Sequence, residues 1–204
     1  ILRDAWDTRL DALTQPVDEP SWNLDPRSGP QADFLSLALL QPASTVRERE
    51  QLLERWRKMP AYIEQCRRNI ERGVANGRVA SRTSVTRVLG QLDQLLQTPL
   101  AHSPLTEPTR RALAASPDLG RWRTGVEQVV RSGIYPAVDR YRDTLRDRLL
   151  PVARSDEKPG IGFVDGGEQA YRAAIRRHTS LDSSAEEIHG FGVSEVARIR
   201  GEIS

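Results

Sequence analysis

The feature that most constrains this chain is an apolar stripe about thirty residues long whose members recur every three or four positions. Its members are Leu119, Trp122, Val126, Val130, Ile134, Val138, Tyr141, Leu145 and Leu149. Because an α-helix repeats every 3.6 residues, side chains at these steps share one face. At about 1.5 Å per residue such a helix would be on the order of 50 Å long. Gly133 and Pro136 lie near its middle, so we expect a bend or a local break there.

Two further stripes predict helices earlier in the chain. The first alternates steps of four and three through Leu52, Trp56, Met59, Ile63, Cys66, Ile70 and Val74, and the second comprises Val85, Val88, Leu89, Leu92, Leu95 and Leu96. Pro60 interrupts the first stripe and either kinks one helix or starts a second at its first turn. Gly73, Asn76 and Gly77 are expected to end it. Ser81 or Ser84 opens the next helix, and Thr98 closes it.

Alternation of period two is nowhere sustained, so the sequence predicts an all-α fold, an irregular multi-helix assembly with long amphipathic helices. We expect one helical domain over residues 1–204. Proline-rich stretches and glycines divide it into an N-terminal helix and loop (1–31), helices (32–97), a proline-rich loop with a short helix after Thr106 (98–117), a long helix opened by Asp118 (118–152) and closing helices (166–204).

Composition excludes several classes of function. Thirty basic and twenty-eight acidic side chains leave a formal net charge of +2, so we expect no nucleic-acid partner. No run approaches the roughly 18 apolar residues of a membrane span, so no membrane association is expected. The single cysteine, Cys66, excludes an internal disulfide and a zinc site built from paired cysteines.

The search for catalytic chemistry assigns no catalytic residue, no cofactor-binding residue and no metal ligand. Neither a G-x-S-x-G nor a P-loop pattern occurs, and Cys66 lies on an apolar seam, where a small buried hydrophobe is expected. Glu186 and His189 come nearest to metal-ligand spacing, three residues apart on one helix. Carboxylate-bridged metal sites need a second such pair, which this sequence lacks. The four tryptophans are interpreted as core anchors.

The closing helix is predicted from Ser184 and Glu187, which form a capping-box pattern. Ile188, Gly192, Val196, Ile199 and Ile203 follow at helical spacing, and the last of them lies one residue from the end of the chain. The first residue is not Met. We therefore interpret the 204 residues as a piece of a longer protein whose remainder covers this stripe.

The same segment carries a resemblance to a known family. It matches at Gly167, Tyr171, Thr179, Glu186, Glu187, Ile188, His189, Gly192, Glu195, Val196, Arg198 and Ile199, and an upstream run, Met59-Pro60-Ala61-Tyr62-Ile63-Glu64-Gln65 with Gly73 and Gly77, matches as well. These residues resemble the bacterial "domain of unknown function 885" family over most of residues 45 to 203. The sequence departs from the family pattern at Ser184, Ala185 and the pair Gly190-Phe191.

The resemblance implies a relation to helical zinc metallopeptidases, in which an H-E-x-x-H helix of the second half supplies two ligands and a general base. That motif is absent from this chain. The resemblance therefore implies a non-catalytic N-terminal helical portion, one wall of a substrate cleft, with zinc bound only by the missing C-terminal half. The alternative is a helical scaffold or protein-interaction module without catalysis. The expected partners are the missing C-terminal half or, through Val196, Ile199 and Ile203, a second copy of the chain.

Overall fold

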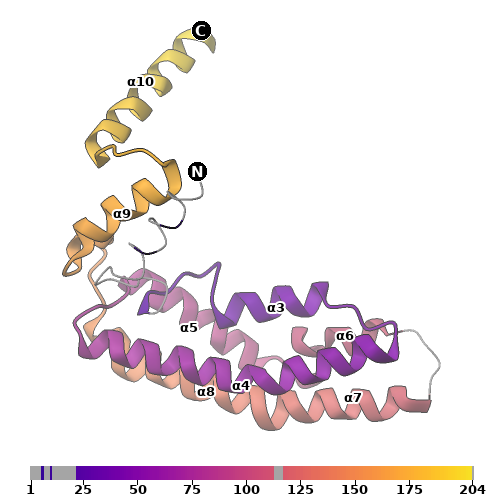
Figure 1. The fold of residues 1–204 in the computed structure, drawn as a ribbon. Coiled ribbons are helices and arrows are strands. Elements are labelled where there is room, and N and C mark those ends of the chain that lie inside the picture. Colours follow the sequence, from indigo (N-terminus) through magenta and orange to yellow (C-terminus); the bar gives the residue numbers. More distant parts are fainter. Residues whose placement is uncertain (1–5, 7–9, 11–21, 113–116, 204) are drawn as a thin grey trace. The chain divides into compact units, whose positions relative to one another are not determined.

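The computed structural model describes residues 6, 10, 22–112 and 117–203, and helices dominate these ranges (Figure 1). No β-strand occurs among them, although an isolated parallel bridge joins Ser81 and Arg154. The all-α prediction is therefore confirmed. Contacts divide the chain into one unit of residues 20–159 and a second unit of residues 1–19 with 160–204.

The unit of residues 20–159 begins with α3 (Pro30–Leu40) and α4 (Val46–Ala75). Thr45 caps α4 in a full capping box, in which Thr45 Oγ1 accepts from Glu48 N and Glu48 Oε2 accepts from Thr45 N at 2.8 Å. Pro60 lies inside α4. A single helix therefore continues through the proline, and the alternative in which Pro60 starts a second helix is wrong. The helix ends at Ala75, within the segment from Gly73 to Gly77 where its end was predicted. Gly77 adopts a left-handed backbone there, and the N–H of Arg78 donates to Gly73 O at 2.8 Å.

The next helix, α5 (Arg82–Gln97), begins at the cap Ser81 and ends at Thr98, both among the predicted boundary residues. The proline-rich stretch that follows forms short turns of helix: η1 (Leu100–His102), η2 (Pro104–Thr106) and α6 (Glu107–Arg111). The indole of Trp56 in α4 donates to Leu105 O at 3.0 Å. This bond attaches the irregular stretch to α4, the longest continuous α-helix among the described residues.

The long helix is built from α7 (Pro117–Val129), η3 (Val130–Ile134), α8 (Tyr135–Thr144) and η4 (Leu145–Leu149), followed by the turn η5 (Leu150–Val152). Both η3 and η4 are π-helical. In η3 the N–H of Tyr135 donates to Val130 O, five residues back. Pro136 has no N–H to continue the α-helical ladder, which explains the widened turn at the place where a break was expected. Asp118 lies inside the first turn of α7, so its assignment as the cap was wrong.

The helices α4 and α7–α8 lie side by side and run in the same direction (Figure 1). Trp122 Nε1 donates to Arg49 O at 2.8 Å, near the start of both helices. Further along, an added Cβ on Gly125 would lie 3.4 Å from Leu53 Cδ2, and one on Gly133 would lie 3.3 Å from Pro60 Cγ. The glycines Gly125 and Gly133 thus leave room for side chains of α4, and the Pro60 ring packs against the π-helical segment η3.

The core of this unit consists of the predicted stripes. All nine members of the stripe from Leu119 to Leu149 are buried, as are Leu52, Trp56, Met59, Ile63 and Ile70 of α4 and Val85, Val88, Leu92 and Leu95 of α5. Trp22, Trp56 and Trp122 are buried as expected, whereas Trp6 is 65% exposed, so its interpretation as a core anchor was wrong.

A short segment after the long helix is attached to the start of α5. The backbone of Arg154 accepts from Arg82 N at 2.8 Å and donates to Ala80 O at 3.0 Å. The carboxylate of Asp156 accepts from both the backbone N–H of Thr83, at 3.0 Å, and the Thr83 hydroxyl, at 2.6 Å. Asp156 therefore caps the first turn of α5 from a distant part of the chain.

The second unit contains η6 (Ile161–Phe163), α9 (Gly167–Thr179) and α10 (Ala185–Ile203). Gly167 opens α9 in close contact with the preceding turn, since an added Cβ there would lie 1.8 Å from Ile161 O. The predicted capping box of α10 is confirmed: Ser184 Oγ accepts from Glu187 N at 3.1 Å and Glu187 Oε2 accepts from Ser184 N at 2.8 Å.

We predict that Gly73→Ala destabilises the protein, because the new Cβ would lie 2.5 Å from Trp22 Cβ and 2.7 Å from Arg78 O. Forcing a methyl group into such a contact costs about 1–3 kcal/mol. The control is Gly90→Ala in α5, where nothing lies within 4 Å and a gain of about 0.5–1 kcal/mol is expected. Urea unfolding measures both; equal effects at the two glycines would contradict the packing.

We also predict that Asp156→Asn weakens folding at neutral pH. The hydrogen bonds from Thr83 lower the pKa of the Asp156 carboxyl below its usual 3.8. A lowered folded pKa stabilises the protein above the unfolded pKa, and this contribution disappears as the pH falls through the folded value. The difference between wild type and variant should therefore vanish in acid. Unfolding midpoints measured against pH test this, with the exposed neighbour Glu157→Gln as the control.

Candidate functional site

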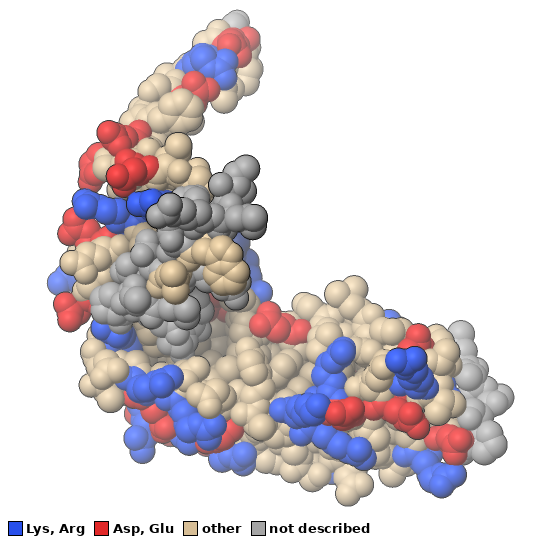
Figure 2. Space-filling view, in the orientation of Figure 1, with Lys and Arg blue, Asp and Glu red and all other residues tan. Residues whose placement is uncertain are grey.

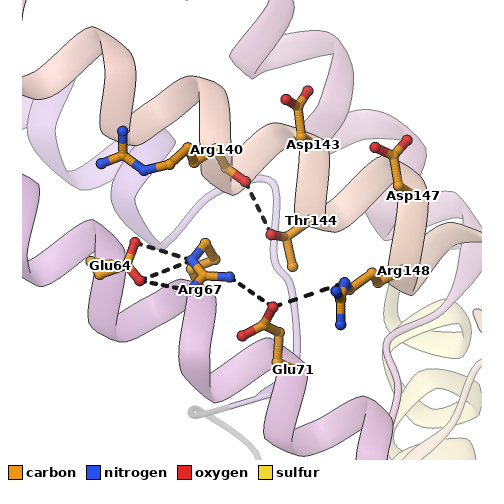
Figure 3. Close-up of a pocket in the computed structure, with 8 residues that line it drawn as sticks. All are labelled: Glu64, Arg67, Glu71, Arg140, Asp143, Thr144, Asp147 and Arg148. Atoms are coloured by element: carbon orange, nitrogen blue, oxygen red, sulfur yellow. Dashed lines mark hydrogen bonds and ion pairs between the residues drawn. The ribbon is translucent and has the colours of Figure 1, made fainter.

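A polar groove lies between α4 and the C-terminal part of the long helix (Figure 3). Seven of the eight residues that line it are charged, and the eighth is a threonine. The lining residues are Glu64, Arg67 and Glu71 of α4 and Arg140, Asp143, Thr144, Asp147 and Arg148 of α8 and η4. Both signs of charge are present on each wall. One wall includes the second π-helical segment, a type of turn that is frequent at functional sites.

Arg67 is the centre of the α4 wall. Its Nε and one terminal nitrogen donate to the Glu64 carboxylate at 3.0 and 2.7 Å, and its other terminal nitrogen donates to Glu71 at 2.7 Å. All three side chains are only about a quarter exposed. The hydrogen bond from Arg67 lowers the pKa of Glu64, and the same bond raises the pKa of Arg67. The pair of Glu64 and Arg67 is therefore stabilised in its ionised form.

The opposite wall is held by its own interactions. Thr144 donates to Arg140 O at 3.0 Å, and Arg146 bridges Asp143 and Asp147 at 2.7 and 3.0 Å. Across the groove, Arg148 Nε approaches Glu71 Oε1 at 4.0 Å (Figure 3). On α8 itself, Arg142 pairs with Asp139 three residues earlier. Glu64, Arg67 and Glu71 have the same kind of spacing, and it could have indicated this cluster from the sequence.

The chemistry open to the groove follows from these pairs. A general acid needs a carboxyl whose pKa is raised towards neutrality, whereas that of Glu64 is lowered. Outside the groove, the thiol of Cys66 is a poor nucleophile, because burial raises its pKa. Burial likewise raises the pKa of Tyr141, which is 2% exposed in the core. The groove is thus suited to structural ion pairing or to contact with a charged surface.

The sequence-derived metal candidates lie elsewhere. Glu186 and His189 are both exposed on α10, one turn apart. Glu187, not Glu186, makes the capping contact with Ser184. Within the described residues, no group of three or more His, Cys, Asp and Glu side chains is arranged to hold a metal ion. A structural or catalytic zinc needs at least three protein ligands, so the residues at this position do not fit a zinc site.

The exposed surface carries mixed charge. Figure 2 shows Lys and Arg interspersed with Asp and Glu over the visible face of each unit. Among the described residues, none of the helices combines the length and apolar character that crossing a bilayer requires.

Comparisons with known proteins place this architecture in a family. A family model described as "Bacterial protein of unknown function (DUF885)" matches residues 1–204. The crystal structure of a candidate lipoprotein from Colwellia psychrerythraea is similar, with a TM-score of 0.75 and 22% sequence identity over 85% of this chain and 30% of that chain. At this identity the likeness shows the fold alone. Because the match covers 30% of that chain, this protein spans less than a third of the length of the solved relative. The curated proteins include no significant match.

We predict that Arg67→Gln raises the pKa of Glu64 towards its usual 4.5, because the variant removes the hydrogen bonds that stabilise the carboxylate. NMR titration of the side-chain carboxyl carbons measures the change. The matched control is Arg68→Gln, since Arg68 lies 3.8 Å from the same carboxylate and should affect it less. Equal pKa shifts in the two variants would show that the hydrogen bonds from Arg67 do not cause the lowered pKa of Glu64.

Proposed function

This chain belongs to the DUF885 family of bacterial proteins, and on that premise we propose that it is the non-catalytic helical portion of a zinc-dependent metallopeptidase. In this proposal its helices form one wall of the substrate cleft. The zinc ligands and the general base lie in polypeptide outside these 204 residues. The observation that carries the proposal is the family signature on α9 and α10, because the family resembles helical zinc metallopeptidases.

The length of the solved relative supports this assignment. The part that this chain matches is 30% of that relative, so most of the relative lies outside the shared helices. The chain's own residues would contribute shape and charge rather than bond-breaking chemistry. The groove beside Arg67 offers ionised carboxylates and guanidinium groups that can position polar segments of a bound chain.

A second candidate function is a helical scaffold or protein-interaction module without catalysis. The observation that favours it is the exposure of large apolar side chains on α10, among them Phe191 and Ile203 at 69% and 81%. Apolar residues that gather on one exposed helix mark interaction sites. This alternative requires neither a metal nor a second half of the protein.

We expect the isolated 204-residue chain to bind zinc only adventitiously and to hydrolyse no peptide. Calorimetric titration with zinc tests the first point. The longer polypeptide encoded by the gene should contain about one zinc per chain and lose peptide hydrolysis when a chelator removes it. A stoichiometric site of about micromolar affinity in the isolated chain would overturn the proposal, and Glu186→Gln and His189→Ala would then locate it. A longer polypeptide without zinc or hydrolysis would favour the scaffold.

A further inference from the structure

The chain passes twice between its two units, at residues 19–20 and at residues 159–160. Shortly after the first passage, Trp22 is 3% exposed and packs against the end of α4. An added Cβ on Gly73 of that helix would lie 2.5 Å from Trp22 Cβ and 2.7 Å from Arg78 O. This packing fixes the chain to the larger unit directly after it enters that unit.

Just before the second passage, Arg154 holds the chain to the larger unit. Its backbone N–H donates to Ala80 O at 3.0 Å. Its guanidinium donates to Val79 O at 2.7 Å and to Pro159 O at 3.1 Å. The side chain of Arg154 therefore connects the last carbonyl before the passage to the loop between α4 and α5.

After the second passage, the chain is attached to its own unit within one turn. The N–H of Phe163 donates to Gly160 O at 3.3 Å, and the N–H of Gly167 donates to Val164 O at 2.8 Å. Val164 is buried, at 5% exposed. The turn η6 is thus held to the start of α9, and the peptide bond between Pro159 and Gly160 joins two anchored segments.

Both passages are attached to the same short loop of the larger unit. Trp22 packs beside the carbonyl of Arg78, and Arg154 bonds the carbonyls of the next two residues, Val79 and Ala80. Two connections that leave a unit from neighbouring residues define one line about which the other unit can turn. Connections at opposite ends of a unit would prevent such a rotation. The attachment of both passages to one loop is therefore the arrangement that a hinge requires.

Gly160 has the conformational freedom that a hinge needs. Its φ and ψ are −72° and 158°, and nothing lies within 4 Å of a Cβ added there. Glycine can adopt backbone angles that other residues rarely reach. Hinges consist of a few residues in loops or at the ends of elements, which absorb the change in φ and ψ. Units joined through proline and glycine linkers are expected to move relative to one another.

We propose that the unit containing residues 160–204 turns about a hinge at Gly160, and that Arg154 fixes the position of this hinge on the larger unit. The inference is independent of the proposed peptidase function, because it concerns only the connection between the two units. Its consequence is a change in orientation between two parts of the family signature. One part lies on α9 and α10, and the other lies on α4.

Distances between two spin labels, measured by pulsed electron paramagnetic resonance, test the hinge in the 204-residue chain. The background variant is Cys66→Ser. The pair Arg87→Cys and Gln169→Cys joins α5 to α9, whereas the pair Arg87→Cys and Arg57→Cys lies within the larger unit. All three labelled positions are exposed. We expect the distance distribution between the units to be roughly twice as wide as the distribution within the larger unit, or wider.

Two variants locate the hinge. Gly160→Val should narrow the distribution between the units, because a β-branched residue accepts the observed backbone angles and few others. The control Gly162→Ala should leave that distribution unchanged, since nothing lies within 4 Å of the added Cβ. Arg154→Gln should widen the distribution, because Val79 O and Pro159 O lose the guanidinium that joins them.

A distribution between the units as narrow as the one within the larger unit would overturn the inference, because the two units would then form one rigid body. A wide distribution that responds to neither Gly160→Val nor Arg154→Gln would also overturn it, since the motion would then arise elsewhere in the chain. Circular dichroism checks that each variant folds. Zinc content and peptide hydrolysis are measured separately, so the proposed function can fail while the hinge is confirmed.

Discussion

The packing of α4 against α7–α8 is the interaction on which the larger unit depends. The two helices run in the same direction, and each has an irregularity that the other accommodates: Pro60 in α4 lies against Gly133 in the π-helical turn. Indole hydrogen bonds from Trp122 and Trp56 attach α7 and the η2 turn to α4. Each large apolar side chain buried in this seam contributes about 1.5–3 kcal/mol, so the seam outweighs the exposed ion pairs around it.

This scaffold separates structural charge from surfaces that are open to a partner. The carboxylates of Glu64 and Glu71 are paired with Arg67 of the same helix, and Arg148 of η4 approaches Glu71 from the opposite wall. On α10, by contrast, the apolar side chains of Val196 and Ile199 are exposed.

The sequence predicted much of the fold because its strongest signals are local. The caps Ser81 and Ser184 and the glycine terminus after α4 are read from a few neighbouring residues, and the structure confirms each. No starting residue was predicted for α4, although Thr45 and Glu48 carry a readable capping box. Asp118 was misassigned because the helix begins at the preceding proline. The groove beside Arg67 was not predicted, because its walls come from helices about seventy residues apart.

The sequence alone determined that the chain is helical and which face of α4, α5 and the long helix from α7 to η4 is buried, since periodicity depends only on the covalent spacing of side chains. It also located the irregularity near Pro136, because a proline cannot donate to the helical ladder. Only the tertiary structure decided how that irregularity is resolved. From Trp122 to Val138 the stripe advances by four residues at every step, which would drift by about 40° per step around an ideal α-helix. The π-helical turn reduces this drift and keeps the stripe against α4, because burial of the whole row is worth more than regular hydrogen bonding in one turn.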